Sequence, residues 1–390
     1  MSLVIVVGGL EPTQDGIGDH SRRVASALIK RGISTSILAL SDGRVASGEL
    51  RARQSDDGVE IDTLRLPSNT RFAERVARGR RFIDEVGARH ALFGFAPYQF
   101  DMRGVVSRAL VELPEMVKGL TSSILFHETW IGEEETSGVW TRLVGFTQRR
   151  LIQMLVHDLK PVVCYSTNPL YRRMLDAYDI RSEMIPHCGN VPVQATDASD
   201  WLPQELAKGG VQLGPNGLKD LYLIGMFGSL YDLLELPKLL PIFDTVARRK
   251  GKRPVIANIG IIGGRPEWKA WQKTYGPQYG LVDIGPSTTL RISQFINSVD
   301  IGMSSTGLAQ FGKSGTGAAF VEHGVPVLIP SEYPHFRHWR ESMLADYPPN
   351  CFRLTLDISA RLCAAERLPA RPLLPLLADK LEADLRPYVR

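Results

Sequence analysis

Residues 3–40, LVIVVGGLEPTQDGIGDHSRRVASALIKRGISTSILAL, decide the fold class of this chain. The apolar run Leu3–Val7 is typical of a buried strand in a parallel sheet. A glycine-bearing loop over residues 8–20 follows, and a helix is expected to begin near Ser21, which can act as its N-cap. Ile33–Leu40 predicts the next strand. This order of elements opens a doubly wound α/β domain.

The same alternation of strand and helix recurs along the chain. Further strands are predicted at 59–66, 124–126, 161–165, 222–227, 255–261, 281–285, 300–303 and 325–329, with helices between most of them. Residues 193–220 are rich in Pro, Gly, Asp and Gln and predict an inter-domain linker. We therefore expect Rossmann-like domains at 1–195 and 215–370, and a C-terminal helix near 373–390 that can cross back to the first domain.

Composition excludes several classes of protein. Of the 390 residues, 44% are hydrophobic and 23% charged, as in ordinary globular proteins. Lys and Arg number 46 against 42 Asp and Glu, spread over both halves, so no basic nucleic-acid-binding lobe is expected. The four cysteines show no metal-ligand spacing, which suits reduced thiols in a cytosolic protein. Neither a membrane-spanning run nor a signal peptide is expected.

A second informative stretch runs from Gly312 to Val327. Lys313, Ser314, Gly315, Thr316 and Gly317 stand before an expected helix. Backbone N–H groups at a helix start bind phosphate well, and a lysine adds a point charge. The stretch therefore favours an anion site over a plain solvated loop. Residues 307–314 also match the bare P-loop pattern, which would need a strand directly before Gly307 and a helix directly after Ser314.

Polar residues follow two strands of the first domain. The loop Gly16–His20 lacks the third glycine of a dinucleotide fingerprint, so NAD is disfavoured, and the alternatives are a packing turn or a ligand-facing loop. His127 ends another strand, where it can hydrogen-bond a sugar hydroxyl, and Trp130 can stack on a ring. The acidic run 133–135 predicts a solvated loop.

Three weaker signals concern cations and strand ends. The turn Phe227–Ser229 ends the first strand of the second domain, at the edge where ligands of open α/β sheets collect. Arg265 and Arg291 are candidate phosphate contacts. The arginine-rich run 71–81 predicts a solvated helix face, with binding to an anionic membrane surface or to a charged acceptor as the alternative.

Together these segments resemble the GT-B fold glycosyltransferases, and within them the large retaining group that includes sucrose-phosphate and mannosyl transferases. The Gly16–His20 loop, His127, the turn 227–229 and the stretch 318–327 carry the resemblance, which covers nearly the whole chain. The chain is divergent, because Phe311 and Ala319 stand where that group has its Glu-x7-Glu pair.

The resemblance implies an α/β protein with two Rossmann-like domains facing an inter-domain cleft. It implies transfer of a sugar from a nucleoside diphosphate to an acceptor hydroxyl, with retention and without metal or bound cofactor. Catalytic roles fall to His127 and Lys313, and Asp19 or His20 would be the base if the reaction inverts. Donor contacts are expected from Gly18, Gly228, Ser229, Arg265, Lys313, Ser314, Gly315, Thr316, Gly317 and Glu322, and acceptor contacts from His20, Glu128 and Trp130.

Three alternatives stay open. They are a catalytically inactive GT-B protein that acts as a binding partner, a P-loop phosphotransferase, and a sugar-nucleotide epimerase of the same fold. The expected partners are a nucleotide sugar and a glycan, lipid-linked or small-molecule acceptor, without nucleic acid. We expect a cytoplasmic protein and leave open a peripheral contact with the inner face of the membrane. The oligomeric state is not predicted.

Overall fold

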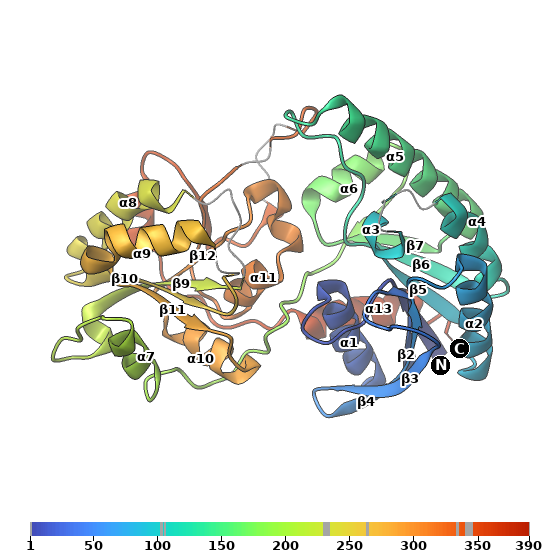
Figure 1. The fold of residues 1–390 in the computed structure, drawn as a ribbon, viewed down its shortest axis with the longest axis horizontal. Helices are drawn as coiled ribbons and strands as arrows, with labels where there is room; N and C mark the ends of the chain where they lie inside the picture. Colours follow the sequence, from blue (N-terminus) through green and yellow to red (C-terminus); the bar gives the residue numbers. More distant parts are fainter. Residues whose placement is uncertain are drawn as a thin grey trace. The chain divides into compact units, whose positions relative to one another are not determined.

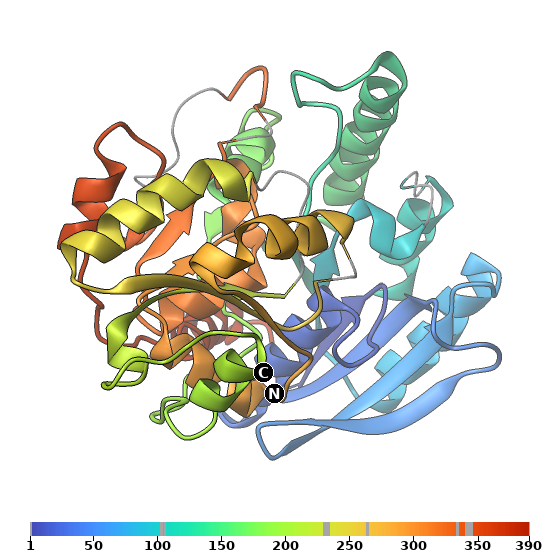
Figure 2. The same ribbon diagram turned by 60° about the vertical axis from the view of Figure 1, so that its left-hand side comes forward.

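The computed structural model describes residues 2–101, 104, 107–228, 235–262, 265–332, 335–339 and 346–389. The chain divides into two compact units (Figure 1). The first comprises residues 1–187, 335–340 and 373–390, and the second comprises 188–334 and 341–372. Each unit is built on one sheet with helices on both faces (Figures 1 and 2).

The first unit has an eight-stranded sheet in the order β3-β4-β2-β1-β5-β6-β7-β8. All neighbours are parallel except β3 and β4. β3 was not predicted, because its residues LRARQSD are polar and lie at the exposed edge of the sheet. The strands are β1 Ser2–Val7, β2 Ser34–Asp42, β3 Leu50–Asp56, β4 Val59–Pro67, β5 His90–Phe95, β6 Thr121–Phe126, β7 Val163–Ser166 and β8 Glu183–Met184.

Seven helices surround this sheet within the described residues: α1 Gly16–Ile29, α2 Phe72–Glu85, α3 Pro97–Phe100, α4 Ser107–Met116, α5 Val139–Leu159, α6 Pro169–Asp176 and α13 Leu374–Leu385. The last of them, α13, belongs to the first unit and packs on α1. Leu377, Leu381 and Leu385 recur every four residues and are buried. Tyr165 donates a hydrogen bond to Asp384 at 3.0 Å, which ties this helix to β7.

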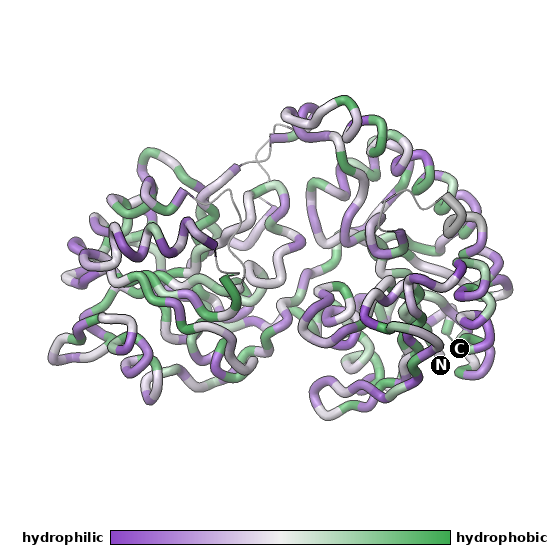
Figure 3. The backbone as a smooth tube through the Cα atoms, viewed as in Figure 1, coloured by the Kyte–Doolittle hydropathy of each residue, from purple (hydrophilic) through white to green (hydrophobic). Residues whose placement is uncertain are grey.

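The second unit has a six-stranded parallel sheet in the order β11-β10-β9-β12-β13-β14. Alternate residues of β9 enter separate cores on the two faces: Leu221 and Leu223 on one, Tyr222 and Ile224 on the other. The central strands are accordingly hydrophobic along most of their length (Figure 3). The strands are β9 Leu221–Phe227, β10 Arg253–Ile259, β11 Leu281–Gly285, β12 Ile301–Met303, β13 Val327–Ile329 and β14 Cys351–Arg353.

The helices of the second unit are α7 Leu202–Lys208, α8 Leu236–Arg249, α9 Pro266–Tyr279, α10 Thr289–Ser298, α11 Gly315–Glu322 and α12 Ile358–Ala364, with 3₁₀ turns η1 Leu218–Asp220 and η2 Leu308–Lys313. The prediction of a linker at 193–220 was wrong. Ala198, Leu202 and Leu206 are fully buried in the core of this unit. Apolar residues spaced four apart outweigh the many turn-forming residues around them, so the segment folds onto the sheet.

The acidic run 133–135 lies in a loop with Glu135 exposed, as predicted, but this loop is held in place by contacts that the prediction did not include. Glu134 forms a β-bridge with Phe336, and the N–H of Glu135 donates to the carbonyl of His335 at 2.8 Å. Glu133 accepts a hydrogen bond from the Trp130 indole at 2.9 Å. The run is fixed by a segment some 200 residues away in sequence, which a local charge pattern cannot reveal.

Candidate active site

In the first unit, helix α1 begins earlier than predicted. Asp15, not Ser21, is the N-cap, and its carboxylate accepts a hydrogen bond from the Gly18 N–H at 2.8 Å. Gly16 and Gly18 therefore lie in the first turn of the helix and not in a loop. Because glycine is a poor helix former, the sequence pattern favoured a loop, and the capping hydrogen bond reverses that preference.

The chain packs closely where β1 ends. A Cβ on Gly8 would lie 2.2 Å from the carbonyl oxygen of Gln99, and one on Gly18 would lie 3.0 Å from that of Gly9. Both distances concern backbone atoms, which cannot move aside easily. The role of Gly18 that the geometry supports is thus close packing of α1 against residues 9 and 10, the packing alternative considered for this loop.

Three histidines meet at the carboxyl ends of the strands of this unit. His20 lies in the first turns of α1, His127 directly follows β6, and His187 lies three residues beyond β8. The ring of His20 is 5.1 Å from that of His127, edge to face, and 5.5 Å from that of His187, stacked. His187 was missed from the sequence, although its place after Ile185–Pro186 at a strand end was a usable signal.

Burial disfavours the charged form of the His20 and His127 rings. It lowers the pKa of His127 to about 3, with a smaller contribution from His187. Burial, together with His127 and His187, also lowers the pKa of His20 well below the usual value. Among the described residues, neither the Nε2 of His20 nor that of His127 has a hydrogen-bond partner. Buried polar atoms are almost always satisfied by protein groups, water or a ligand, so these two nitrogens are available to an added hydrogen-bond partner.

The remaining first-unit candidates have partners of their own. Asp19 pairs with Arg22 and accepts the Thr13 N–H at 3.0 Å, so its carboxylate is held in the helix start. Trp130 is only 5% exposed and lies edge to face with the ring of Tyr178, so its ring is already covered. Glu128, next to His127, is partly exposed. The geometry supports His20 and His127 more strongly than Asp19 or Trp130.

In the second unit, helix α11 begins directly after Ser314, whose hydroxyl accepts the Gly317 N–H at 3.1 Å as the N-cap. The sequence pattern placed Gly315 and Gly317 before the helix. That prediction was wrong, because the Ser314 cap starts the helix at Gly315. Lys313 precedes the cap and is partly exposed. The first N–H groups of a helix have no partner within the helix, so this start can receive an anion.

The P-loop interpretation of residues 307–314 does not fit this geometry. Strand β12 ends at Met303, four residues before Gly307. Residues 308–313 form a 3₁₀ turn whose Leu308 and Phe311 are buried in the core, and the Gly312 N–H donates to the Tyr347 hydroxyl at 3.1 Å. A P-loop instead directs its backbone N–H groups at phosphate.

The end of β9 meets the start of α11, and the end of β10 lies beside the end of β9. Gly228, at the end of β9, has φ +82°, and a Cβ there would lie 3.1 Å from the Cγ2 of Thr316. Gly260, at the end of β10, has φ +108° and approaches the Gly228 backbone equally closely. The second unit thus brings Gly228 and Thr316 together, two positions expected to bind the donor. Ser229 lies outside the described residues.

Other donor-side candidates have structural contacts. The ring of Phe311 occupies the space that a Gly317 side chain would need, 2.4 Å from an ideal Cβ. Glu322 is 2% exposed, and its carboxylate accepts the Gly189 N–H at 2.8 Å. Arg291 pairs with Glu205 at 3.5 Å and stacks over Trp201. Arg265 immediately precedes α9 at the β10 edge and is partly exposed.

The two positions that replace the acidic pair are part of the core. Ala319 is fully buried and Phe311 is 4% exposed, both in the same cluster of the second unit. A carboxylate at either position would face apolar neighbours, which is costly. Phe311 and Ala319, which stand in place of the two glutamates, therefore both fit the apolar core in which they lie.

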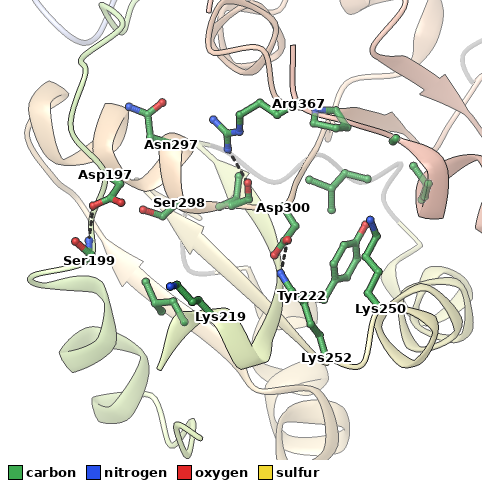
Figure 4. Close-up of a pocket in the computed structure, with 16 residues that line it drawn as sticks. Asp197, Ser199, Lys219, Tyr222, Lys250, Lys252, Asn297, Ser298, Asp300 and Arg367 are labelled. Atoms are coloured by element: carbon green, nitrogen blue, oxygen red, sulfur yellow. Dashed lines mark hydrogen bonds and ion pairs between the residues drawn. The ribbon is translucent and has the colours of Figure 1, made fainter. Parts of the chain in front are cut away.

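A cavity of about 430 Å³ lies at the opposite edge of this sheet, where β9 and β12 begin (Figure 4). Its lining is rich in cations, two of which have structural partners. Lys252 pairs with Asp300 at 2.7 Å, and Arg367 donates to the carbonyl of Val299 at 2.8 Å, just past α10. Lys250 stands at the C-cap of α8. Cations at helix C-termini stabilise the helices, so this cavity is not our candidate for a diphosphate.

The arginines of α2 are also largely paired. Arg75 is buried and donates to the carbonyl of Leu40 at 2.7 Å. Arg78 pairs with Glu74, and Arg80 with Asp84. Among the arginines of this run, Arg71 and Arg81 are the exposed ones without an ion pair described here. This argues against binding of the helix to an anionic membrane surface.

Within the described ranges, no group of three or more His, Cys, Asp or Glu side chains converges in a way that could hold a metal ion. The histidine cluster agrees with this finding, because its rings contact one another edge to face or stacked.

Comparison with known proteins shows similarity in structure and not in sequence. No protein-family model matches the chain, and no curated protein sequence matches it. Among solved structures, Anabaena HepE in complex with UDP aligns with TM-score 0.54 at 11% identity, over 98% of this chain and 95% of that one. An α,α-trehalose-phosphate synthase from Burkholderia xenovorans aligns with TM-score 0.51 at 12% identity, over 99% and 100%. A glycosyltransferase from Rickettsia africae aligns with TM-score 0.50 at 10% identity, over 100% and 94%.

These alignments extend over both units and define the class of the fold. The chain has the GT-B fold, with two Rossmann-like units, as the sequence resemblance implied. At 10–12% identity the likeness identifies the fold alone.

Proposed function

We propose that this protein is a glycosyltransferase that moves a sugar from a nucleoside diphosphate to an acceptor hydroxyl. The observation that carries the proposal is the start of α11, where Ser314 caps the helix, Lys313 precedes it and Gly228 meets Thr316 at the end of β9. A neutral cap leaves the positive end of the helix dipole available to a phosphate.

This arrangement suits the departure of a nucleoside diphosphate. Charge develops on the diphosphate as the sugar bond breaks, and preorganised N–H groups with a nearby cation stabilise it. We assign this role to the N–H groups at Gly315 and Thr316 and to the ammonium of Lys313. Arg265, Ser229 and Gly228 are further donor-side candidates, and Gly317 and Glu322 support the helix through packing and the bond to Gly189.

We assign sugar recognition to the histidine cluster of the first unit. A neutral imidazole can both donate and accept a hydrogen bond, which suits hydroxyl groups. The unsatisfied Nε2 atoms of His20 and His127 support this assignment. Glu128 is the acceptor-side candidate beside them. A retaining transfer needs no general base, which agrees with the pairing of Asp19 to Arg22.

The test is isothermal titration with UDP-, GDP-, ADP- and dTDP-sugars, beginning with the UDP-sugars because HepE binds UDP. We expect one of them to bind wild type and to bind Lys313→Ala about tenfold or more weakly. Lys219→Ala is the matched control, because that exposed lysine lines the cavity at the opposite edge of the same sheet. It should bind like wild type.

The other outcomes identify the alternatives. Failure of every nucleotide sugar to bind would contradict the proposal and favour an inactive GT-B partner protein. Binding of Mg-ATP alone, lost in Lys313→Ala, would favour a phosphotransferase. Conversion of the donor without any acceptor would favour an epimerase. For an active enzyme, the anomeric configuration of the product tests retention, and activity in EDTA tests independence from metal.

A further inference from the structure

Helix α5 carries a row of exposed apolar side chains. Trp140 is 81% exposed and Val139 70%, and Leu143, Phe146 and Met154 are each at least half exposed. Single exposed hydrophobic residues are common on protein surfaces, but a contiguous row on one element is not. Along α5 the tube of Figure 3 accordingly alternates between hydrophobic and hydrophilic colours.

The row lies on one face of the helix, opposite the face that packs. At 100° per residue, positions 139, 143, 146, 150 and 154 fall on the same side, and Trp140 lies at the margin of that side. The opposite side holds the buried Gly145, Gln148, Ile152 and Leu155.

The helix is firmly attached through that buried side. Gln148 accepts the Ile131 N–H at 3.0 Å and donates to the carbonyl of Gly104 at 3.1 Å. A Cβ on Gly145 would lie only 1.8 Å from the Ile131 carbonyl oxygen, so the helix lies directly against the backbone at Ile131. The apolar face is therefore presented by a fixed helix.

Charge distinguishes between possible occupants of this face. Arg142 and Arg150 are exposed beside the apolar row, and the guanidinium of Arg150 lies 5.6 Å from the ring of Phe146. Asp158 is the single acidic residue of the helix, and it contacts the neighbouring His157. In a symmetric dimer, equivalent patches face each other, which would bring these arginines together. An anionic lipid surface complements both the apolar and the cationic side chains.

We propose that the exposed face of α5, formed by Val139, Trp140, Leu143, Phe146 and Met154 with Arg142 and Arg150, binds the surface of an anionic membrane. The helix lies flat in the headgroup region and inserts its apolar side chains. No helix among the described residues is long and apolar enough to span a membrane, so the contact is peripheral. The inference does not rest on the nucleotide site, and it places the contact on α5 and not on α2.

The test is co-sedimentation of the full chain with vesicles of phosphatidylcholine containing 30% phosphatidylglycerol, about the anionic content at which basic segments bind. We expect binding that weakens with added salt and is absent with phosphatidylcholine alone. The double variant Trp140→Gln with Phe146→Gln should bind about tenfold or more weakly. Leu290→Gln with Leu356→Gln, which changes two exposed leucines of the second unit, should bind like wild type.

A second set of variants changes arginines and tests whether α5 or α2 contacts the membrane. Arg142→Gln with Arg150→Gln should lose about fivefold in affinity for each arginine, whereas Arg71→Gln with Arg81→Gln on α2 should lose little. Brominated lipid should quench part of the tryptophan fluorescence, and Trp140→Phe should remove that part. Absence of binding to anionic vesicles, binding unaffected by the Trp140 and Phe146 changes, or a dimer in vesicle-free solution that those changes dissociate would each overturn the proposal.

Discussion

The two units begin a helix with the same short pattern and make different use of it. Asp15-Gly16-Ile17-Gly18 starts α1 in the first unit, and Ser314-Gly315-Thr316-Gly317 starts α11 in the second. In both, the cap side chain accepts the N–H three residues ahead, at 2.8 Å from Gly18 and 3.1 Å from Gly317. The caps differ in charge, because one is a carboxylate and the other a hydroxyl.

That difference decides which helix start can receive a phosphate. A carboxylate at the N-cap neutralises the positive end of the helix and repels a second anion, whereas a hydroxyl does neither. Burial raises the pKa of Asp15, and the N–H groups of Gly18 and Ile17 oppose that rise only in part. We therefore expect the first unit to use its helix start for packing and the second to use its start for binding.

The largest effect should follow from exchanging the cap charge. Ser314→Asp retains an N-cap residue, so the melting temperature should stay within a few degrees of wild type. A carboxylate about 4 Å from a phosphate costs several kcal/mol at the effective dielectric of a protein surface, so nucleotide-sugar affinity should fall about 100-fold or more. Isothermal titration measures this change.

The reciprocal variant is the control. Asp15→Asn also retains a cap and removes the charge in the first unit, and it should leave nucleotide-sugar affinity within about twofold of wild type. If Ser314→Asp binds as wild type does, the start of α11 is not the diphosphate site.

Acid should destabilise the chain through the histidine cluster. The folded-state pKa of His127 is lowered to about 3 from an ordinary 6.5, so unfolding takes up a proton below that ordinary value. The stability that neutral His127 contributes is complete above pH 6.5 and is lost as the pH falls toward 3. The slope is about 1.4 kcal/mol per pH unit for this residue, and His20 adds to it.

Urea unfolding at several pH values between 7 and 4 measures this slope. His127→Phe should reduce it by about one proton, whatever its effect on stability at pH 7. His157→Gln, which removes a histidine at an exposed position in α5, is the matched control. An unchanged slope in His127→Phe would show that this ring is charged in the folded protein.

The sequence revealed the order of strands and helices better than their ends. Buried runs such as Leu3–Val7 and Tyr222–Phe227 have a strong pattern of their own, and each forms a strand within one residue of its prediction. The starts of α1 and α11 were misjudged because a single capping hydrogen bond decides them. His187 and Trp130 show a second limit, since their surroundings come from distant segments that one sequence does not align.

The interior glycines of the two helix starts should respond differently to a methyl group. In Gly317→Ala the new Cβ meets the Phe311 ring at 2.4 Å, and we expect a loss of about 2 kcal/mol in unfolding free energy. In Gly18→Ala it meets backbone at 3.0 Å, and we expect about 1 kcal/mol. Phe311→Leu should rescue part of the loss in Gly317→Ala and none in Gly18→Ala. If Phe311→Leu changes the loss of unfolding free energy equally in Gly317→Ala and Gly18→Ala, the packing assigned to Gly317 is contradicted.

The smallest effect concerns the first glycine of each helix. A Cβ on Gly16 meets no atom within 4 Å, and one on Gly315 meets only the Asn190 amide at 3.9 Å. Alanine at either position should therefore raise the unfolding free energy slightly, by about 0.5 kcal/mol, because alanine restricts the unfolded chain more than glycine. Denaturant unfolding of the two variants should give matching gains.

Gly16→Ala and Gly315→Ala should differ, however, in their affinity for the nucleotide sugar. If a phosphate approaches the backbone at the start of α11, the methyl of Gly315→Ala must displace it, and affinity should fall roughly threefold to tenfold. Gly16→Ala has no such ligand to displace, because the carboxylate of Asp15 already occupies its helix start. Since neither variant is strained, a loss of affinity in Gly315→Ala cannot be attributed to unfolding. Equal affinity in the two would mean that the diphosphate does not lie against the backbone of α11, whatever the charge of its cap.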